Sequence, residues 1–234
     1  MHHRLIARAA LALLATSPAH AATRGFIVTD FDSLRLEGPI EVSIETGRGV
    51  SARGEGDADL LDRLDLAVSA RVLTIRLKRS PFESRETRNG PLRLTLTAPT
   101  LRRLQLSGAG SIKAKGLDKL RAEVISAGSG SIAVAGIATD TLSVAQLGSG
   151  AIALAGAAKS LTMRVSGSGS LDAKTLTAAD LDLTLDGSAS VTLVADRTAK
   201  IAATGPGSIT ITGKAACTVR HTGSGAVTCG ARSY

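Results

Sequence analysis

The chain has 234 residues, of which 44% are hydrophobic and only 2% aromatic, and its 28 basic and 20 acidic residues give a formal net charge of +8. Nucleic-acid-binding domains combine concentrated basic residues with aromatic side chains that stack on bases. With three phenylalanines, one tyrosine and no tryptophan, the composition argues against a nucleic-acid partner and against a sugar site built on aromatic rings.

The first 21 residues have the three parts of a secretory signal peptide. Arg4 and Arg8 give a positive start, Ala9–Ala15 is a short apolar run, and Ala19-His20-Ala21 fits the cleavage pattern. No segment approaches the ~20 apolar residues that a membrane-spanning helix needs. We therefore expect a signal peptide at 1–21 and one exported domain at 22–234, periplasmic or extracellular, without an integral membrane segment.

The region before residue 108 is less regular. Residues 34–44 (LRLEGPIEVSI) alternate around a Gly-Pro corner, which indicates a first coil of strand, corner and strand. Residues 57–66 (DADLLDRLDL) predict a short helix that Asp57 caps. Residues 72–97 hold two alternating stretches, a strand pair. We interpret this helix and strand pair as an insertion or a cap that covers the first end of the fold.

From residue 108 onward one phrase recurs seven times: glycine, a small residue, glycine or alanine, a small residue and an aliphatic residue. The first glycines of the copies are 18 to 20 residues apart, a period that indicates a solenoid. Glycine suits a thin corner between two strands because it allows backbone conformations and close approaches that a side chain obstructs. The predicted corner glycines are Gly108, Gly128, Gly148, Gly167, Gly187, Gly205 and Gly223.

Aliphatic residues recur at fixed offsets from these glycines. The positions four and six residues after each corner, and four and six residues before it, are almost all aliphatic and alternate with small or polar residues. One such unit cannot bury its own apolar row, but units stacked ~4.8 Å apart form a continuous core. The sequence therefore predicts an all-β fold, a single-domain parallel β-helix of about seven to eight coils.

The chain contains two cysteines, Cys217 and Cys229, both in the last two repeats. In an exported protein an even, closely spaced pair favours a disulfide bond. Both align with inward-facing rows, which we interpret as positions on neighbouring coils. The predicted bridge would pin the last coil.

No residues stand out as catalytic, cofactor-binding or metal-binding. His221 has no apparent partner for acid–base chemistry. Asp172, Asp182 and Asp186 lie at different offsets from their glycines and form no single row. The glycine corners precede strands, whereas a phosphate cradle needs a following helix N-terminus. We expect no cofactor and no metal.

Several stretches together resemble one known family, the head GIN domain proteins, which are named for auto-transporter adhesins. They are DFDSLRLEGPIEVSI at 30–44, GDADLLDRL at 56–64, LTIR at 73–76 and the repeating GSGSI corners, and the resemblance spans about residues 23–229. It implies a β-helical, extracytoplasmic domain and supplies no catalytic residues.

The sequence thus predicts an exported, non-enzymatic β-helix that is associated with the envelope and acts as a binding or structural, adhesin-like module. Its partner is unknown; an envelope polymer or a protein surface is possible. The alternative is a carbohydrate-active β-helix that acts on an acidic polysaccharide, and the shortage of aromatic side chains weakens it.

Overall fold

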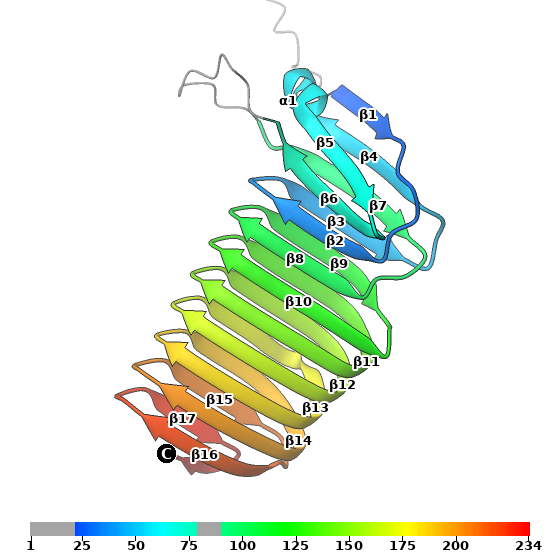
Figure 1. Ribbon diagram of the computed structural model, residues 1–234. Coiled ribbons are helices and arrows are strands. Elements are labelled where there is room, and N and C mark those ends of the chain that lie inside the picture. The colour runs from blue at the N-terminus through cyan, green and yellow to red at the C-terminus, as the bar shows by residue number, and fades with distance from the viewer. Residues whose placement is uncertain (1–21, 79–89) are drawn as a thin grey trace, which may run out of the picture.

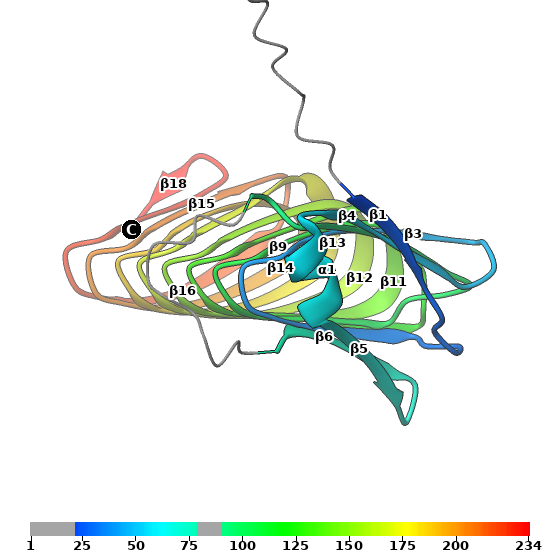
Figure 2. The same ribbon diagram turned by 90° about the horizontal axis from the view of Figure 1, so that it is seen from above.

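The computed structural model describes residues 22–78 and 90–234, so the predicted signal peptide at 1–21 lies outside the described residues. The chain winds into a flattened parallel β-helix with two walls, joined on one side by the glycine corners (Figures 1 and 2). The predicted all-β fold is confirmed. The β-helix has about six turns, slightly fewer than the seven to eight coils predicted.

The first wall contains the strands that precede the corners. Its members pair side by side in parallel, with equivalent residues in register. In stacking order the first wall consists of β6 (Val72–Leu77), β2 (Ser33–Glu37), β8 (Arg103–Gly108), β10 (Arg121–Gly128), the second parts of β11 (Ser131–Gly148), β12 (Ala151–Gly167), β13 (Ser170–Gly187) and β14 (Ser190–Thr204), and β16 (Ala216–Thr222).

The second wall contains the strands that follow the corners. β11 to β14 each cross the second wall and then bend back into the first, so one strand serves both walls. In stacking order the second wall consists of β7 (Arg93–Ala98), β3 (Glu41–Thr46), β9 (Ser111–Leu117), the first parts of β11 to β14, β15 (Ser208–Thr212) and β17 (Ala226–Cys229).

The core lies between the two walls and consists of the predicted aliphatic rows. Ile132, Val134, Leu142 and Val144, which represent the four rows in one turn, are at most 2% exposed. A further inward row lies two residues before each corner, and the sequence pattern did not reveal it. It includes Gln146, which is 1% exposed and donates hydrogen bonds from Nε2 to the carbonyl oxygens of Gly150 (2.5 Å) and Ser170 (3.4 Å).

At the first end of the β-helix, the spatial order of the strands differs from their order along the chain. The predicted strand pair at 72–97 forms β6 and β7, which do not pair with each other but add to opposite walls, outside β2 and β3. The coil predicted at 34–44 therefore lies between two coils that come later in the chain. Three antiparallel strands cover this end: β1 (Ala22–Phe26), β4 (Ser51–Gly56) and β5 (Leu64–Ser69).

The predicted helix at 57–66 is shorter than expected. Helix α1 (Ala58–Arg63) begins after Asp57, whose side chain accepts a hydrogen bond of 2.9 Å from the backbone N–H of Asp59. Leu64 already belongs to β5, because antiparallel pairing with β6 satisfies the backbone there and overrides the helical spacing of the leucines. At the opposite end, β18 (Arg232–Ser233) pairs with β17. No helix in the described ranges is long and apolar enough to cross a membrane.

Candidate functional site

The predicted corner glycines form a stacked column along one side of the β-helix. All seven have a φ angle between 105° and 135°, which side chains rarely adopt. The backbone N–H groups of the corners are already used: those of Ser129 and Gly130, for example, both donate to the carbonyl oxygen of Gly108 in the previous corner. The corners therefore offer little free backbone to a ligand.

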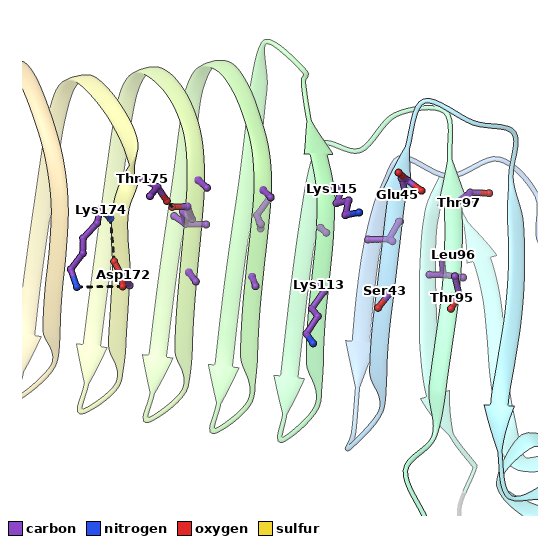
Figure 3. A pocket seen from close by; sticks show the side chains of 18 residues that line it. Ser43, Glu45, Thr95, Leu96, Thr97, Lys113, Lys115, Asp172, Lys174 and Thr175 are labelled. Atoms are coloured by element: carbon purple, nitrogen blue, oxygen red, sulfur yellow. Dashed lines mark hydrogen bonds and ion pairs between the residues drawn. The ribbon is translucent and has the colours of Figure 1, made fainter. Parts of the chain in front are cut away.

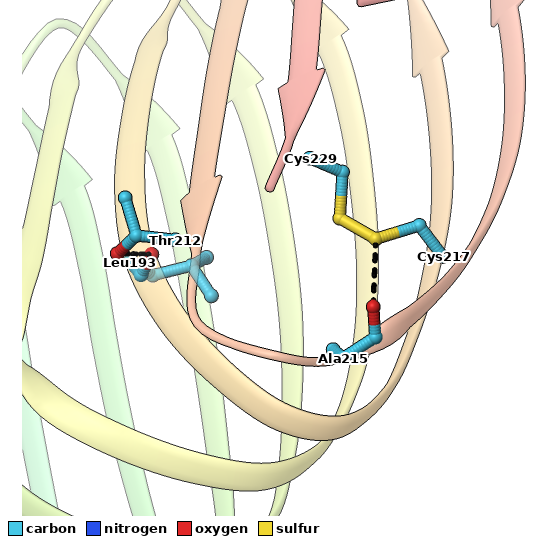
Figure 4. The surroundings of a disulfide bond; sticks show 5 residues. All are labelled: Leu193, Thr212, Ala215, Cys217 and Cys229. Carbon is cyan, nitrogen blue, oxygen red and sulfur yellow. Dashed lines mark hydrogen bonds between the residues drawn. A yellow bond between two sulfur atoms is a disulfide. The ribbon is translucent and has the colours of Figure 1, made fainter. Parts of the chain in front are cut away.

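The two cysteines lie across the core from each other at the last turn. A disulfide bond joins Cys217 in β16 to Cys229 in β17, with 6.5 Å between their Cα atoms (Figure 4). The sequence pattern predicts a bridge between two neighbouring coils. The bridge instead links the two walls of one turn. The reason is the symmetric spacing, since each cysteine is six residues from the corner at Gly223.

The titratable residues that the sequence raised as candidates do not gather into a site. The described residues contain no group of three or more His, Cys, Asp or Glu side chains that could hold a metal ion. Asp172 lies on the second wall, whereas Asp182 and Asp186 lie in the first-wall part of β13. His221 lies in β16, beside Ala203 of the previous turn, and its Nε2 atom has no hydrogen-bond partner among the described residues.

One carboxylate in β13, that of Asp180, has a strongly shifted pKa. Hydrogen bonds from Arg197 and Thr198 lower the pKa of Asp180 to about 2, helped by the positive charges of Arg197 and Lys200. A general acid that works near neutral pH needs a raised pKa, so the shift has the wrong sign for that role. The Asp180–Arg197 pair therefore serves to link β13 to the bend of β14.

The outer face of the second wall carries a groove of about 690 Å³ that crosses β7, β3, β9, β11, β12 and β13 (Figure 3). Its floor consists of residues five and seven positions after two successive corners, and all four are alanines: Ala133, Ala135, Ala153 and Ala155. We call these four residues the alanine floor. Parallel register places Ala133 beside Ala153, and the register between β11 and β12 shifts after Val134.

Longer side chains at the equivalent positions of the neighbouring turns form two rims that bound the alanine floor within this groove. Lys113 and Lys115 project from β9 on one side, and Asp172 and Lys174 project from β13 on the other (Figure 3). The groove exists because two alanines, Ala133 and Ala153, stand between Lys113 and Asp172 in one column of register partners. At ~4.8 Å per strand, the rims are three strand spacings or ~14 Å apart.

The charges on the two rims differ. Lys174 Nζ lies 3.6 Å from a carboxylate oxygen of Asp172. Lys113 and Lys115 form no ion pair with any described residue, and Glu45 is the register neighbour of Lys115 in β3. The rim on β9 therefore presents two exposed ammonium groups beside an apolar floor.

Sequence reasoning missed this groove, although its signal was present. Aligning the outward positions on the corner glycines gives Lys-x-Lys, Ala-x-Ala, Ala-x-Ala and Asp-x-Lys in four successive turns. The predicted core uses only the inward positions, whereas the groove is formed by the outward ones. The groove combines a hollow, an apolar floor and two lysines without an ion-pair partner among the described residues.

Comparison with known proteins gives the fold a family and relatives. The family model described as "Putative auto-transporter adhesin, head GIN domain" matches residues 30–215. A structure described as a "putative adhesin", from Bacteroides fragilis NCTC 9343, is 20% identical, with 90% of this chain and 97% of that chain covered and a TM-score of 0.80.

Two further solved structures share the fold. A "Putative lipid binding protein" from Parabacteroides distasonis ATCC 8503 is 20% identical, with coverage of 90% and 97% and a TM-score of 0.67. A "putative adhesin" from Parabacteroides merdae ATCC 43184 is 18% identical, with coverage of 90% and 96% and a TM-score of 0.65. Such identities show a common fold. The comparison with curated proteins found no match.

Proposed function

Because this chain belongs to the head GIN domain family, we propose that it is an exported, non-enzymatic binding module of the adhesin type, with the groove on the second wall as its contact surface. The observation that carries this proposal is the alanine floor beside Lys113 and Lys115, two lysines without ion-pair partners among the described residues. The partner would be a negatively charged envelope polymer or protein surface.

The β-helix holds this groove rigidly. Each floor residue lies in a strand that is paired on both sides, and its inward neighbours, such as Val134 and Leu154, are 2% exposed. A surface fixed in this way loses little conformational entropy when it binds a partner. Preorganisation therefore compensates in part for the small contact area that alanine side chains offer.

The charge of the groove favours an anionic partner. The ammonium groups of Lys113 and Lys115 are exposed and unpaired, and residues 22–234, without Arg4 and Arg8, keep 26 basic and 20 acidic residues, a formal net charge of +6. Long-range attraction of this kind raises association rates with acidic partners. An apolar floor between polar rims then provides short-range contact.

The proposal of a non-enzymatic role is supported by the arrangement of the titratable groups. Asp180, whose pKa is lowered to about 2, is tied to Arg197, and Asp172 lies beside Lys174 at the groove rim. Hydrolysis of a polysaccharide by the usual route needs two carboxyl groups that flank one bond. Of the groove-lining residues, Glu45 and Asp172 carry carboxyl groups, and they lie on opposite sides of the alanine floor.

The test compares binding of the mature chain, residues 22–234, with that of a groove variant that carries Ala133→Glu and Ala153→Glu. Two probes are used: polygalacturonate as an acidic polysaccharide, and vesicles of phosphatidylglycerol or phosphatidylcholine, since one relative is described as a "Putative lipid binding protein". We expect the wild-type chain to bind an anionic probe, and the double substitution to weaken binding at least about tenfold by charge repulsion.

The matched control is Ala145→Glu, which is compared with the single variant Ala133→Glu: each adds one negative charge to β11, on the outer face of the first wall and in the groove respectively. Both the groove positions and Ala145 point outward, and other turns carry charged residues in the same columns, so the fold should tolerate each change. Equal loss of binding in the control, or none in the groove variant, would exclude the groove as contact surface. Release of shortened polygalacturonate by the wild-type chain would overturn the non-enzymatic role.

A further inference from the structure

The last strand of the first wall lacks a cover. Antiparallel strands of the same chain cover the other three wall ends: β5 on β6, β4 on β7, and β18 on β17. Strand β16 pairs with β14 on one side, and no strand in the described part of the chain pairs with its other side. An uncovered strand edge presents a row of backbone N–H and C=O groups that can pair with another chain.

The core is also incompletely covered beside β16. Its inward residues Cys217, Val219 and His221 are half-buried. Their register neighbours one turn earlier, Ala199, Ile201 and Ala203, are 1%, 3% and 5% exposed. The difference shows that each turn needs one more strand beside it to bury its inward row, and β16 has none.

Beside β16 the first wall is one strand shorter than the second wall. Strand β18 runs antiparallel to β17, and the backbone N–H of Tyr234 donates to Val227 at 2.9 Å, so the second wall extends one strand further than the first. The disulfide between Cys217 and Cys229 holds the two walls together at this level (Figure 4). The result is a step at the end of the first wall, where an added strand would lie beside β16 at the level of β18.

A second copy of this chain does not fit the step. If two β16 edges paired about a twofold axis, β18 of one copy would occupy the strand position of β17 of the other copy. Head-to-tail stacking is blocked as well, because β1, β4, β5 and helix α1 cover the first end of the β-helix. An isolated extended segment of another protein meets neither obstacle.

The charges around the step indicate which segment fits. Arg220 points outward from β16, and Lys214 and Arg232 lie just before β16 and in β18; all three are exposed and form no ion pair with described residues. We propose that β16 binds an extended peptide segment of a partner protein by strand addition, and that this segment alternates apolar residues with acidic ones. The apolar residues cover Val219 and its neighbours, and the acidic residues face Arg220.

Strand addition combines backbone hydrogen bonds, which give affinity, with alternate side chains, which give specificity. The chain itself contains a strand with the required pattern. Residues 180–186 (DLDLTLD) form the first-wall part of β13, with leucines inward and acidic residues outward. A synthetic peptide of this sequence is therefore a suitable probe. The proposal of strand addition depends on β16 alone and is independent of the groove.

The experiment measures hydrogen exchange of the oxidised, mature chain with and without the peptide, and the affinity by fluorescence anisotropy. We expect slower exchange at residues 216–222 and none of this effect at β5 or β1. A peptide with Leu183→Pro should not bind, since proline removes a ladder hydrogen bond. A peptide with lysine at all three aspartate positions should bind about tenfold more weakly because it repels Arg220.

A charge reversal in the protein gives the matched test. Arg220→Glu should weaken the acidic peptide about tenfold and strengthen the lysine peptide, while Arg164→Glu should change neither affinity. Arg164 occupies the equivalent outward position of an inner turn, in β12, so it reports general charge effects. Unchanged exchange at 216–222, equal binding of the proline peptide, or equal effects of the two arginine variants would each overturn the proposal. A stable dimer of the mature chain without peptide would overturn it too.

Discussion

The two glycines of each corner should differ in what an alanine does to them. Gly148, the first glycine of its corner, has a φ angle of 112°, and an added Cβ atom would lie 2.6 Å from the carbonyl oxygen of Gly128. Gly150, the second, has no positive φ, and its Cβ would lie 2.4 Å from the carbonyl oxygen of Gly130. Both changes therefore overpack the stack, but only the first also strains the backbone.

The natural sequence already contains the milder change. In the corner that begins at Gly187, Ala189 occupies the second position and is fully buried, so the stack can adjust to a methyl group there. All seven first positions are glycine. Overpacking costs ~1–3 kcal/mol and an unfavourable φ angle a further ~1–3 kcal/mol. We expect a loss of about 2–6 kcal/mol for Gly148→Ala and about 1–3 kcal/mol for Gly150→Ala.

Urea unfolding of the two variants, followed by far-ultraviolet circular dichroism with the disulfide intact, measures this difference. Thermal unfolding gives a second measure of the same difference. A domain of this size changes its melting temperature by ~2–4 °C per kcal/mol, so Gly148→Ala should melt at least a few degrees below Gly150→Ala. The dependence of unfolding on urea should keep its slope, which shows that both variants unfold from the same fold. If Gly150→Ala were equally or more destabilising, the reasoning from the φ angle would be wrong.

Three further changes test the remaining contacts. Cys217→Ser should lower the free energy of unfolding by about 3 kcal/mol, as expected for a short closed loop. Alkylation of the wild-type chain without reductant should leave Cys217 and Cys229 unmodified in its mass spectrum. Two alkylated sites would disprove the bridge. Asp32→Asn should cost about 2–4 kcal/mol in urea unfolding, because the Asp32 carboxylate accepts hydrogen bonds from two arginines and a serine; a loss under 1 kcal/mol would contradict this. Burial opposes but does not outweigh those bonds, which lower the pKa of Asp32, so its contribution is present above the unfolded-state pKa and is lost as the pH falls through the lowered value. Carbon-detected NMR titration should find Asp180 ionised down to about pH 2, with the same sign of pH dependence, and Arg197→Ala should return its midpoint toward 3.8.

Most of the β-helix could be predicted because its repeat fixes both the corners and the inward rows. Ile132 and Val144 each stand at a constant offset from a glycine, and parallel register requires equivalent residues to stack. The row that includes Gln146 escaped prediction because a buried amide reads as a surface residue unless its backbone hydrogen-bond partners are known. The order β6, β2, β8 was not predicted because the sequence pattern does not determine which strands pair in space, and two coils of similar length can stack in either order.

Both proposed surfaces depend on comparisons that single repeats do not contain. The groove is a difference between turns: alanines at 133 and 153 make a hollow only because Lys113 and Asp172 stand in the same column on either side. The step beside β16 is a difference between walls, since β18 extends one wall and nothing in the described chain extends the other. The repeat determines a uniform stack, and a uniform stack has no preferred site. Binding specificity in such a fold must therefore arise where the repeat is broken, either in an outward column or at an end.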